Sequence, residues 1–297
     1  MSSSSIGRRD FMMQTAALAA GAGMASSLFQ AAAAEQSAAK PFKMALIYGM
    51  LPKDLSDEDK FKLAKKCGFE GIESEPVDDL AAAKKRGELA KAAGVPIHSV
   101  IYGGWDPALS DPDLSKQEAA RAKVESALRS ANAMGADCIL LVPGVVKGEV
   151  TYEQAWERSE KHIRTLIPIA EELKVIICIE EVWNNFLLDA NEMAKFVDQF
   201  NSPWVRAYFD VANVVKFAEP QDWIRTLGKR IYKVHVKEYK KADSSWPNLG
   251  EGDVNWPEIR KAFAEIGYQG FGTAELGGGD EAYLTDLRER MTRLLNA

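Results

Sequence analysis

From Lys43 onward the chain alternates eight short β-rich runs with eight longer amphipathic stretches. Short runs that are apolar over most of their length are typical of buried parallel strands, and the longer stretches have the spacing of amphipathic helices. The predicted strands are residues 44–48, 71–74, 96–101, 138–142, 175–180, 205–210, 231–236 and 270–275. The predicted helices are residues 56–67, 79–93, 115–134, 152–173, 190–200, 220–227, 256–266 and 280–294.

Eight strands that each precede a helix predict an α/β protein with a (β/α)₈ TIM barrel as a single domain over residues 43–297. An open doubly wound sheet is the alternative, and it is disfavoured because no Gly-x-Gly-x-x-Gly sequence follows the first strand. Glycines that can adopt the left-handed conformation follow four of the predicted helices, which supports these helix ends. They are Gly68, Gly94, Gly135 and Gly267.

The N-terminal residues 1–34 resemble a twin-arginine-type export signal that is removed. Arg8 and Arg9 precede a weakly apolar stretch, and the alanines at 31–34 offer a cleavage site. Residues 35–42 are predicted to be a flexible lead-in. The resemblance implies export to the periplasm in a folded state.

Composition narrows the classes of partner. The net charge of −6 and the absence of a basic stripe argue against nucleic-acid binding. No apolar run after the signal is long enough to span a membrane. Cys67, Cys138 and Cys178 stand far apart within apolar segments, so we expect buried thiols and no disulfide.

Polar residues stand at the ends of the last four predicted strands. They are the adjacent pair Glu180 and Glu181, then Asp210, His235 and Glu275. The carboxyl ends of barrel strands converge on one site, where clustered carboxylates repel one another unless a cation lies between them. Each residue alone has an ordinary explanation, as a solvated loop carboxylate or a hydrogen-bonded core histidine. Their occurrence at one level of consecutive strands favours a shared divalent metal ion, Mn²⁺ first, with Mg²⁺, Co²⁺ or Zn²⁺ as alternatives.

At these residues the chain resembles the xylose isomerase-like TIM barrels, a superfamily of sugar phosphate isomerases and epimerases. The resemblance covers Lys43 to the C-terminus. It is strongest in Ile-Glu-Glu-Val-Trp-Asn at 179–184, Phe-Asp-Val-Ala-Asn at 209–213, Val-His-Val-Lys-Glu at 234–238 and Leu-Gly-Glu-Gly-Asp-Val-Asn-Trp at 249–256. It implies that Glu180, Asp210, His235 and Glu275 bind the metal and that the two glutamates Glu180 and Glu275 also transfer protons.

One departure from the family pattern leaves a choice between two glutamates. Members of the family usually have Glu-Asn where this chain has Glu180 and Glu181. We favour Glu180 as the ligand because it shares a strand face with the small residue Cys178. Glu181 is then expected to point away from the metal or to orient a neighbour.

Six further residues are predicted to contact the substrate: His98, Trp183, Asn213, Lys237, Glu73 and Lys241. For His98 a core position is an equal alternative, and for Lys237 the alternative is an ordinary surface lysine. Trp183, Asn213 and Lys241 occupy places where relatives contact sugar. Relatives with epimerase activity often have histidine and arginine in place of Asn213 and Lys241, which leaves isomerase and epimerase activity both open.

The predicted function is a divalent-metal-dependent isomerase or epimerase of a small sugar or keto-sugar, acting through an enediolate intermediate. No phosphate-binding loop is evident, which favours an unphosphorylated substrate. Two alternatives remain: a metal-dependent lyase or hydrolase acting on 3-keto-glycosides, and a non-catalytic sugar-binding barrel. A related endonuclease is disfavoured because such enzymes gather several metals with many histidines, and the chain has 3 histidines. The particular sugar and any homo-oligomeric state stay open.

Overall fold

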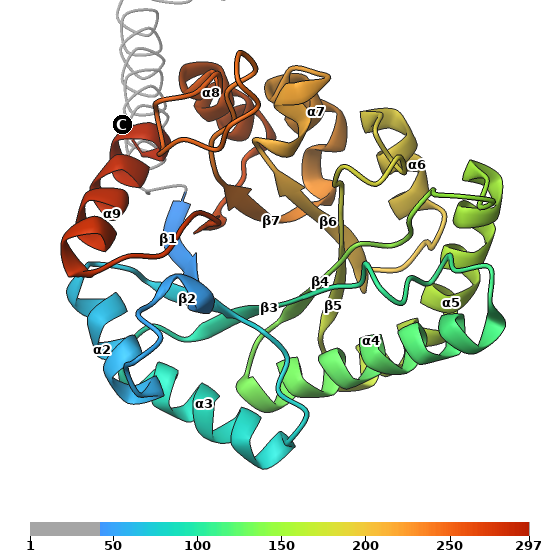
Figure 1. Cartoon of the computed structure of the whole chain (residues 1–297), viewed down its shortest axis with the longest axis horizontal. Coiled ribbons are helices and arrows are strands. Elements are labelled where there is room, and N and C mark those ends of the chain that lie inside the picture. Colours follow the sequence, from blue (N-terminus) through green and yellow to red (C-terminus); the bar gives the residue numbers. More distant parts are fainter. Residues whose placement is uncertain (1–41, 297) are drawn as a thin grey trace, which may run out of the picture. The chain divides into compact units, whose positions relative to one another are not determined.

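The protein is a closed barrel of eight parallel strands, each hydrogen-bonded to the next, with the last paired to the first (Figure 1). The computed structural model describes residues 42–296, so the predicted export signal lies outside the described residues. The strands are β1 (Phe42–Ile47), β2 (Gly71–Ser74), β3 (Ile97–Gly103), β4 (Cys138–Leu141), β5 (Ile176–Glu180), β6 (Val205–Asp210), β7 (Ile231–Val236) and β8 (Gly270–Ala274). The predicted TIM barrel is confirmed.

Helices form a ring outside the strands (Figure 1). They are α2 (Asp57–Lys66), α3 (Leu80–Ala92), α4 (Leu114–Met134), α5 (Tyr152–Leu173), α6 (Ala190–Asp198), α7 (Pro220–Leu227), α8 (Trp256–Ile266) and α9 (Glu281–Leu295). Short 3₁₀ turns are η1 (Tyr48–Met50), η2 (Asn213–Lys216) and η3 (Gly228–Arg230). Within the described residues, no helix is both long and apolar enough to cross a membrane.

Helix boundaries follow local chemistry. Thr151 and Gln154 close a capping box at the start of α5, which satisfies backbone groups that the first turn leaves free. Gly135 ends α4 at φ 80° and Gly267 ends α8 at φ 68°, a conformation that glycine adopts without steric cost. Gly68 and Gly94 also have positive φ, so the predicted left-handed positions are confirmed.

Three predicted boundaries differ from the structure by two residues. Strand β1 begins at Phe42 instead of 44. Strand β3 continues to Gly103 instead of ending at 101, and its register with β4 shifts between Ile101 and Gly103. Helix α6 ends at Asp198 instead of 200, and Asn201 then takes a positive φ of 46°. An irregularity of this kind depends on the neighbouring strand or turn, which hydrophobic spacing does not report.

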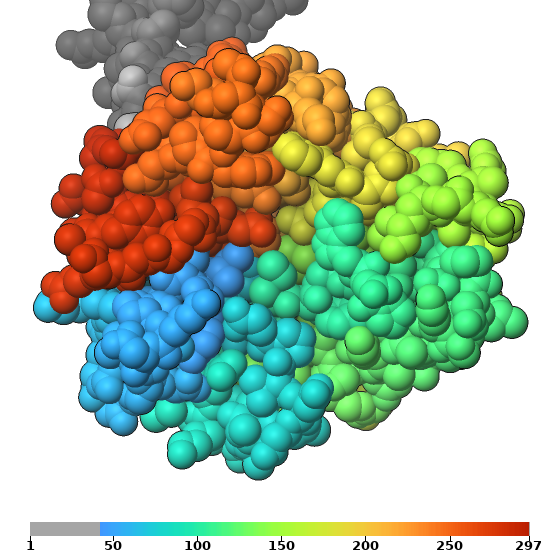
Figure 2. All heavy atoms as spheres, in the orientation of Figure 1, coloured from blue at the N-terminus to red at the C-terminus, as the bar shows by residue number. Residues whose placement is uncertain are grey.

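The core has two parts on either side of the sheet. Outward-facing strand residues such as Leu46, Ile72 and Phe209 pack under the helices. Inside the barrel a separate buried cluster contains Cys138, Leu140, Cys178 and Tyr208. Atoms fill the centre of the ring in the space-filling view (Figure 2), so the barrel interior is a packed core and not a pore. Cys67 is buried as well, and all three thiols are free.

Strand register brings the last four carboxyl ends to one level. Glu180 pairs with Tyr208, Asp210 pairs with His235, and His235 pairs with Thr273. Because side chains alternate between the two faces of a strand, residues at matching positions on neighbouring strands point to the same interior. The barrel therefore gathers the polar strand ends at one end of its axis.

Candidate metal centre

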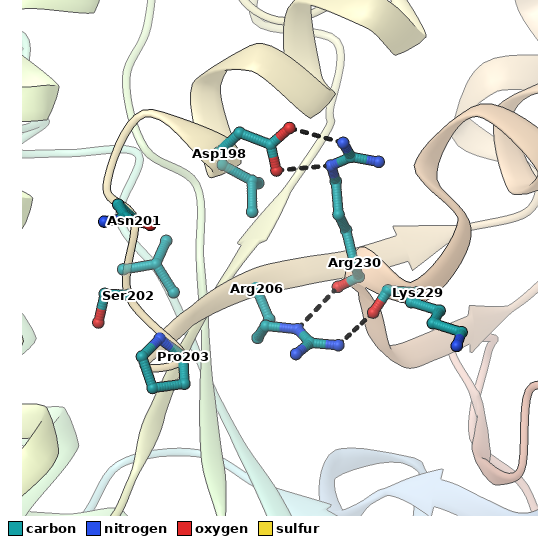
Figure 3. Close-up of a pocket in the computed structure, with 9 residues that line it drawn as sticks. Asp198, Asn201, Ser202, Pro203, Arg206, Lys229 and Arg230 are labelled. Atoms are coloured by element: carbon teal, nitrogen blue, oxygen red, sulfur yellow. Dashed lines mark hydrogen bonds and ion pairs between the residues drawn. The ribbon is translucent and has the colours of Figure 1, made fainter.

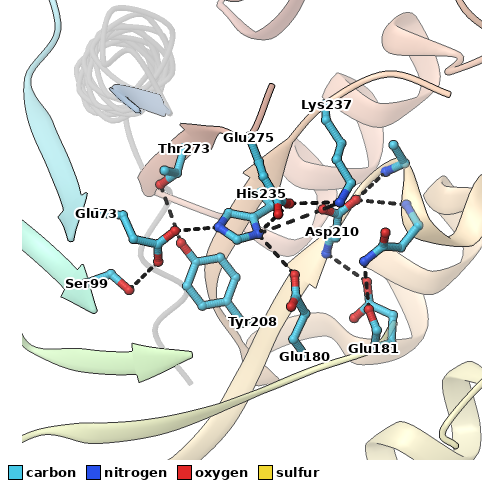
Figure 4. Close-up of polar contacts among 12 residues, drawn as sticks. Glu73, Ser99, Glu180, Glu181, Tyr208, Asp210, His235, Lys237, Thr273 and Glu275 are labelled. Atoms are coloured by element: carbon cyan, nitrogen blue, oxygen red, sulfur yellow. Dashed lines mark hydrogen bonds and ion pairs between the residues drawn. The ribbon is translucent and has the colours of Figure 1, made fainter. Parts of the chain in front are cut away.

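Glu180, Asp210, His235 and Glu275 come together at the carboxyl ends of β5 to β8 (Figure 4). Each offers one ligand atom, and these atoms all lie within 4.8 Å of one another. The Nδ1 atom of His235 lies 3.0 Å from Glu180 Oε1 and 3.2 Å from Glu275 Oε2. The proximity that the sequence predicted for these four residues is confirmed.

The ring of His235 is held from behind by Glu73, which lies far from it in sequence on β2. The distance from His235 Nε2 to Glu73 Oε2 is 2.6 Å, and the hydroxyl of Ser99 donates to the other oxygen of Glu73 at 2.6 Å. Glu73 and His235 are both inaccessible to solvent. The contact commits Nε2 to Glu73 and leaves Nδ1 facing the carboxylates, an arrangement typical of histidines that ligate metals.

Backbone contacts fix the carboxylate of Asp210. Its Oδ1 accepts hydrogen bonds from the amides of Ala212 and Asn213, both at 2.8 Å, and this turns Oδ2 toward the other ligands. Glu181 points to the opposite side, where its Oε1 accepts a hydrogen bond from the Asp210 amide at 2.8 Å. Glu180, and not Glu181, therefore joins the cluster, as the strand alternation predicted.

Lys237 reaches the same point from the end of β7. Its Nζ lies 2.8 Å from Glu275 Oε2 and 3.1 Å from Asp210 Oδ2. The ammonium group is thus close to both ligand oxygens and to the space beside them. A buried ammonium in this place can donate a hydrogen bond to an oxygen that gains negative charge.

Burial and charge shift the acidities of the cluster. Burial raises the pKa of Glu180 to about 7 and also raises the pKa of Asp210. Burial acts in the same direction on Glu275, but the charges of His235 and Lys237 outweigh it and lower the pKa of Glu275. For His235 burial acts to lower the pKa, and the charges of Glu73 and Glu275 raise it well above the usual range. The four groups are therefore strongly coupled by charge.

The ligand set is suited to a dication. Three carboxylates and one imidazole in a buried site are the donors that Mn²⁺, Mg²⁺ and similar ions accept in catalytic centres. Asp210 Oδ2 is buried and accepts no hydrogen bond among the described residues, and the cation nearest to it is the Lys237 ammonium at 3.1 Å, so its lone pairs remain open to a metal ion. One dication and the Lys237 ammonium together balance the charges of the three carboxylates.

A cavity of about 260 Å³ opens directly beside the cluster. Glu180 and Glu275 line it, together with three of the predicted substrate-binding residues, Trp183, Asn213 and Lys237. The cluster therefore borders a space in which a small molecule can reach it.

The other three predicted substrate residues lie elsewhere. Glu73 is below His235, and His98 is buried with its ring stacked on Phe271 at 4.0 Å. Lys241 has an exposed side chain whose Nζ lies 4.0 Å from Glu219. The substrate contacts of all six residues stay predictions. The position of Glu73 favours a role in holding His235, and the position of His98 favours a role in packing the barrel interior.

Sequence reasoning missed several residues around the cavity. Trp105 and Trp246 line it from the loops after β3 and β7. Ser99 and Tyr208 pack below the ligands, and Ser99 fixes Glu73. Inward-facing alternation along β3 and β6 could have identified Ser99 and Tyr208, whereas no local pattern distinguishes the two loop tryptophans.

A larger surface hollow of about 660 Å³ lies near the start of β6 (Figure 3). Its charged groups are paired with one another: Arg230 contacts Asp198 at 2.7 and 2.6 Å, and Arg206 donates to the carbonyls of Lys229 and Arg230. This hollow is at the amino end of the strand, whereas active sites of TIM barrels lie at the carboxyl ends. We assign no functional site to it.

Several proteins similar to this chain are named as sugar epimerases. A putative L-ribulose-5-phosphate 3-epimerase of Escherichia coli is 26% identical over 238 residues, covering 74% of this chain and 83% of that protein. A D-psicose 3-epimerase of Ruminiclostridium cellulolyticum is 30% identical over 119 residues, which is 39% of each chain. The solved D-psicose 3-epimerase of Clostridium cellulolyticum, crystallised with D-tagatose, superposes with a TM-score of 0.73 at 20% identity, covering 86% of this chain and 100% of that one.

The family itself is shown by its sequence pattern. The pattern described as xylose isomerase-like TIM barrel matches residues 61–294, which include every strand from β2 to β8 and all four residues of the cluster. The resemblance noted in the strand-end motifs is therefore confirmed: this chain belongs to the xylose isomerase-like TIM barrel family.

Proposed function

We propose that this protein is a divalent-metal-dependent isomerase or epimerase of a small sugar or keto-sugar, acting through an enediolate intermediate. The observation that supports it most is the convergence of Glu180, Asp210, His235 and Glu275 beside a cavity. The names of the similar proteins agree with it, because they are 3-epimerases of L-ribulose 5-phosphate and D-psicose.

The chemical problem is the weak acidity of a carbon next to a carbonyl group. A dication bound by the cluster would supply Lewis-acid stabilisation of negative charge on the substrate oxygens, on the order of several kcal/mol. Mn²⁺ is the first choice, with Mg²⁺, Co²⁺ or Zn²⁺ as alternatives. Glu73 serves this arrangement indirectly, since it holds the His235 ring in place.

Two carboxylates that line the same cavity can divide the proton transfer between them. Glu180 projects from β5 and Glu275 follows β8, so they approach a molecule in the cavity from different strands. One of them removes the proton and the other can return it. Return to the opposite face of the same carbon gives an epimer, and return to the adjacent carbon gives an isomer.

Lys237 and the cavity wall act on the rest of the substrate. The Lys237 ammonium can donate to the oxygen that becomes negative in the enediolate. Asn213 and Trp183 line the same cavity, and the indole nitrogen of Trp183 donates to the Asn213 carbonyl at 2.8 Å, which fixes the two relative to each other. We infer that they hold hydroxyl groups and the apolar face of a small sugar.

Hydrogen exchange in heavy water tests the proposal. We expect the purified protein with Mn²⁺ to incorporate deuterium next to the carbonyl of at least one sugar in a panel of unphosphorylated ketoses. Chelation should abolish the exchange, and Glu180→Gln or Glu275→Gln should lower it by at least about 10²-fold. Glu172→Gln, the same change at an exposed position of α5, is the matched control and should leave it unchanged.

The outcome also separates this function from its alternatives. Metal-dependent exchange with a dehydrated or cleaved product would identify a lyase or hydrolase instead. Sugar binding without any exchange would leave a binding protein and contradict the proposal.

The cellular location is a separate proposal. We propose a periplasmic protein on the basis of Arg8, Arg9 and the apolar stretch that follows them. A double change to lysine at positions 8 and 9 should retain the protein in the cytoplasm, as measured by cell fractionation. Equal export of both forms would contradict the twin-arginine assignment.

A further inference from the structure

Three exposed tryptophans surround the mouth of the cavity beside the metal centre. Among the described residues, six large hydrophobic side chains are exposed, and three of these line this one cavity: Trp105 at 46%, Trp183 at 36% and Trp246 at 44% exposure. Single exposed hydrophobic residues are normal on protein surfaces, whereas a group of them around a concave site marks a binding surface.

Trp183 and Trp246 belong to a packed aromatic group. Their ring centroids are 5.1 Å apart, and Tyr239 lies 5.2 Å from Trp183 and 5.1 Å from Trp246. The ammonium groups of Lys216 and Lys237 lie over the rings of Trp183 and Trp246 at 4.2 and 4.9 Å. These contacts hold the two indoles in place before any ligand binds, which lowers the entropic cost of binding.

The loop that bears Trp246 is anchored by a buried glutamate at the end of β7. Glu238 accepts hydrogen bonds from the amides of Gly250 and Val254 and from the indole of Trp256, at 2.8, 3.0 and 2.9 Å. A Cβ atom at Gly252 would lie 2.5 Å from the Glu238 side chain, so only glycine allows this close approach. The loop over residues 239–255 is therefore held against the barrel, and Trp246 with it.

Trp105 faces the same cavity from the loop after β3. Strands β3 and β7 are on opposite sides of the closed barrel, so Trp105 and Trp246 approach the mouth from opposite directions. Gly104, directly before Trp105, has a φ of 97° and packs closely against β4. The placement of Trp105 thus depends on a backbone conformation that side chains other than glycine rarely adopt.

The size of the cavity limits what it can enclose. At about 260 Å³ it is below the roughly 300–1,000 Å³ of pockets that enclose drug-sized ligands. One small sugar unit would fill this space, and any further group of the substrate would then lie at the mouth. Trp105 and Trp246 border that mouth with nearly half of each side chain still open to solvent.

We propose that the natural substrate is larger than one sugar: the reacting keto-sugar unit is linked to a second ring, and Trp105 and Trp246 hold that ring at the mouth. The inference rests on the proposed sugar chemistry and specifies its substrate class. Pyranose and aromatic rings share the required property, a flat face of C–H or π surface that packs on indole while the ring edge stays in water. Binding energy from this remote ring would also aid catalysis at the enclosed unit.

Binding titrations with three probes test the proposal. The Mn²⁺-loaded protein is titrated by calorimetry with D-fructose, with a disaccharide that has a hexopyranose on O4 of fructose, and with a fructose that has a phenyl group at the same oxygen. We expect at least one two-ring probe to bind roughly tenfold tighter than fructose, and the tighter of the two identifies the second ring. Equal affinity for all three probes would overturn the proposal.

Substitutions at Trp105 and Trp246 test whether these residues cause the tighter binding of two-ring probes. In wild type we expect a two-ring probe to bind roughly tenfold tighter than fructose, and Trp105→Ala or Trp246→Ala should reduce this affinity ratio to less than about threefold. Trp246→Phe should restore most of the ratio because phenylalanine keeps a flat ring. Phe217→Ala removes an exposed aromatic residue outside the cavity lining and should keep the full affinity ratio. An affinity ratio that stays at the wild-type value in both alanine variants would overturn the proposal. A change of oligomeric state in these variants, with the affinity ratio unchanged, would overturn it as well.

Heavy-water exchange on the same probes separates this inference from the proposed function. Metal-dependent exchange on fructose that is not enhanced by the second ring would refute the substrate class and leave the chemistry intact. Two-ring binding that depends on the tryptophans, with no exchange on any probe, would support the aromatic site and refute the enzymatic function.

Discussion

The two ends of the barrel interior each bury a histidine and a lysine, yet their surroundings differ. Near the amino ends of the strands, His98 stacks on Phe271 and its Nε2 lies 3.2 Å from the Thr273 hydroxyl. Lys233 pairs with a single carboxylate, Asp137, at 2.8 Å. At the carboxyl ends, His235 and Lys237 lie among Glu73, Glu180, Asp210 and Glu275.

The number of carboxylates accounts for the difference. Burial lowers the pKa of His98 well below its usual value, so this imidazole is neutral and needs no counter-ion. Asp137 is about half exposed, so water solvates the one charge that Lys233 balances. At the other end several carboxylates are buried together, and either a proton or an additional cation must relieve their repulsion, which is why burial raises the pKa of Glu180 and Asp210. The same residue types thus support packing at one end and form the candidate metal centre at the other.

We expect the largest difference between the two ends of the barrel in the effect of substitutions on turnover. Asp210→Asn removes a ligand charge at the carboxyl ends, and we expect turnover to fall by at least about 10²-fold because the developing negative charge loses its stabilisation. Lys233→Met at the amino ends should keep turnover within about threefold. Steady-state kinetics of both variants at saturating Mn²⁺ measure the difference. Comparable losses in the two variants would show that the ends are not functionally distinct.

Removal of the metal ion should lower the free energy of unfolding, and this effect should depend on the residues at the carboxyl ends of the strands. A metal ion at a free concentration a hundredfold above its Kd stabilises a folded protein by about 2.7 kcal/mol. For a domain of this size this raises Tm by roughly 5–10 °C. We expect this rise in wild type on addition of Mn²⁺ to chelator-treated protein, and its loss in Asp210→Asn. Calorimetric melting curves give the result, and a full rise in Asp210→Asn would place the ion elsewhere.

Glu73 connects the candidate metal centre to the barrel interior. Glu73→Gln keeps a hydrogen-bond acceptor for His235 Nε2 but removes the charge, so we expect metal affinity to fall about 10- to 100-fold. Glu70→Gln, one residue before β2, is a matched control near the protein surface and should not alter the affinity. Competition with a fluorescent chelator provides the constants. An unchanged affinity in Glu73→Gln would limit Glu73 to packing.

The smallest effect is expected at the amino ends. Lys233→Met keeps most of the side-chain volume and leaves Asp137 in contact with water, so the free energy of unfolding should fall by only about 1 kcal/mol. Denaturant titration of the metal-free protein measures it. A loss of several kcal/mol would mean that the Lys233 pair is a major support of the barrel, and the contrast between the two ends would then be weaker.

The sequence predicted the barrel and the proximity of the four candidate ligands, because both follow from the spacing of residues along the strands. Strand alternation and the convergence of parallel strand ends depend on local spacing, so Glu180, Asp210, His235 and Glu275 could be identified from their positions at strand ends. Alternation from Cys178 also distinguished Glu180 from Glu181. The structure places Glu180 Oε1 3.0 Å from His235 and directs Glu181 to the Asp210 amide.

Other parts depend on closure of the barrel and on loop conformation. Glu73 and His235 are 162 positions apart, and their contact exists because the barrel closes between β8 and β1, so that side chains of β2 and β7 meet in its interior. Trp105 and Trp246 meet at one cavity because two irregular loops fold over the same strand ends. Hydrophobic periodicity describes single helices and strands and contains no information on contacts between residues of distant strands and loops.

The central claim is that one dication lies among the four strand-end residues. Anomalous X-ray scattering at the manganese edge, from crystals grown with Mn²⁺, tests it most directly. The account predicts one ion bound by carboxylate oxygens of Glu180, Asp210 and Glu275 and by Nδ1 of His235, at roughly 2.0–2.3 Å. An anomalous peak at another place, or no peak with Lys237 Nζ still between Asp210 and Glu275, would contradict it.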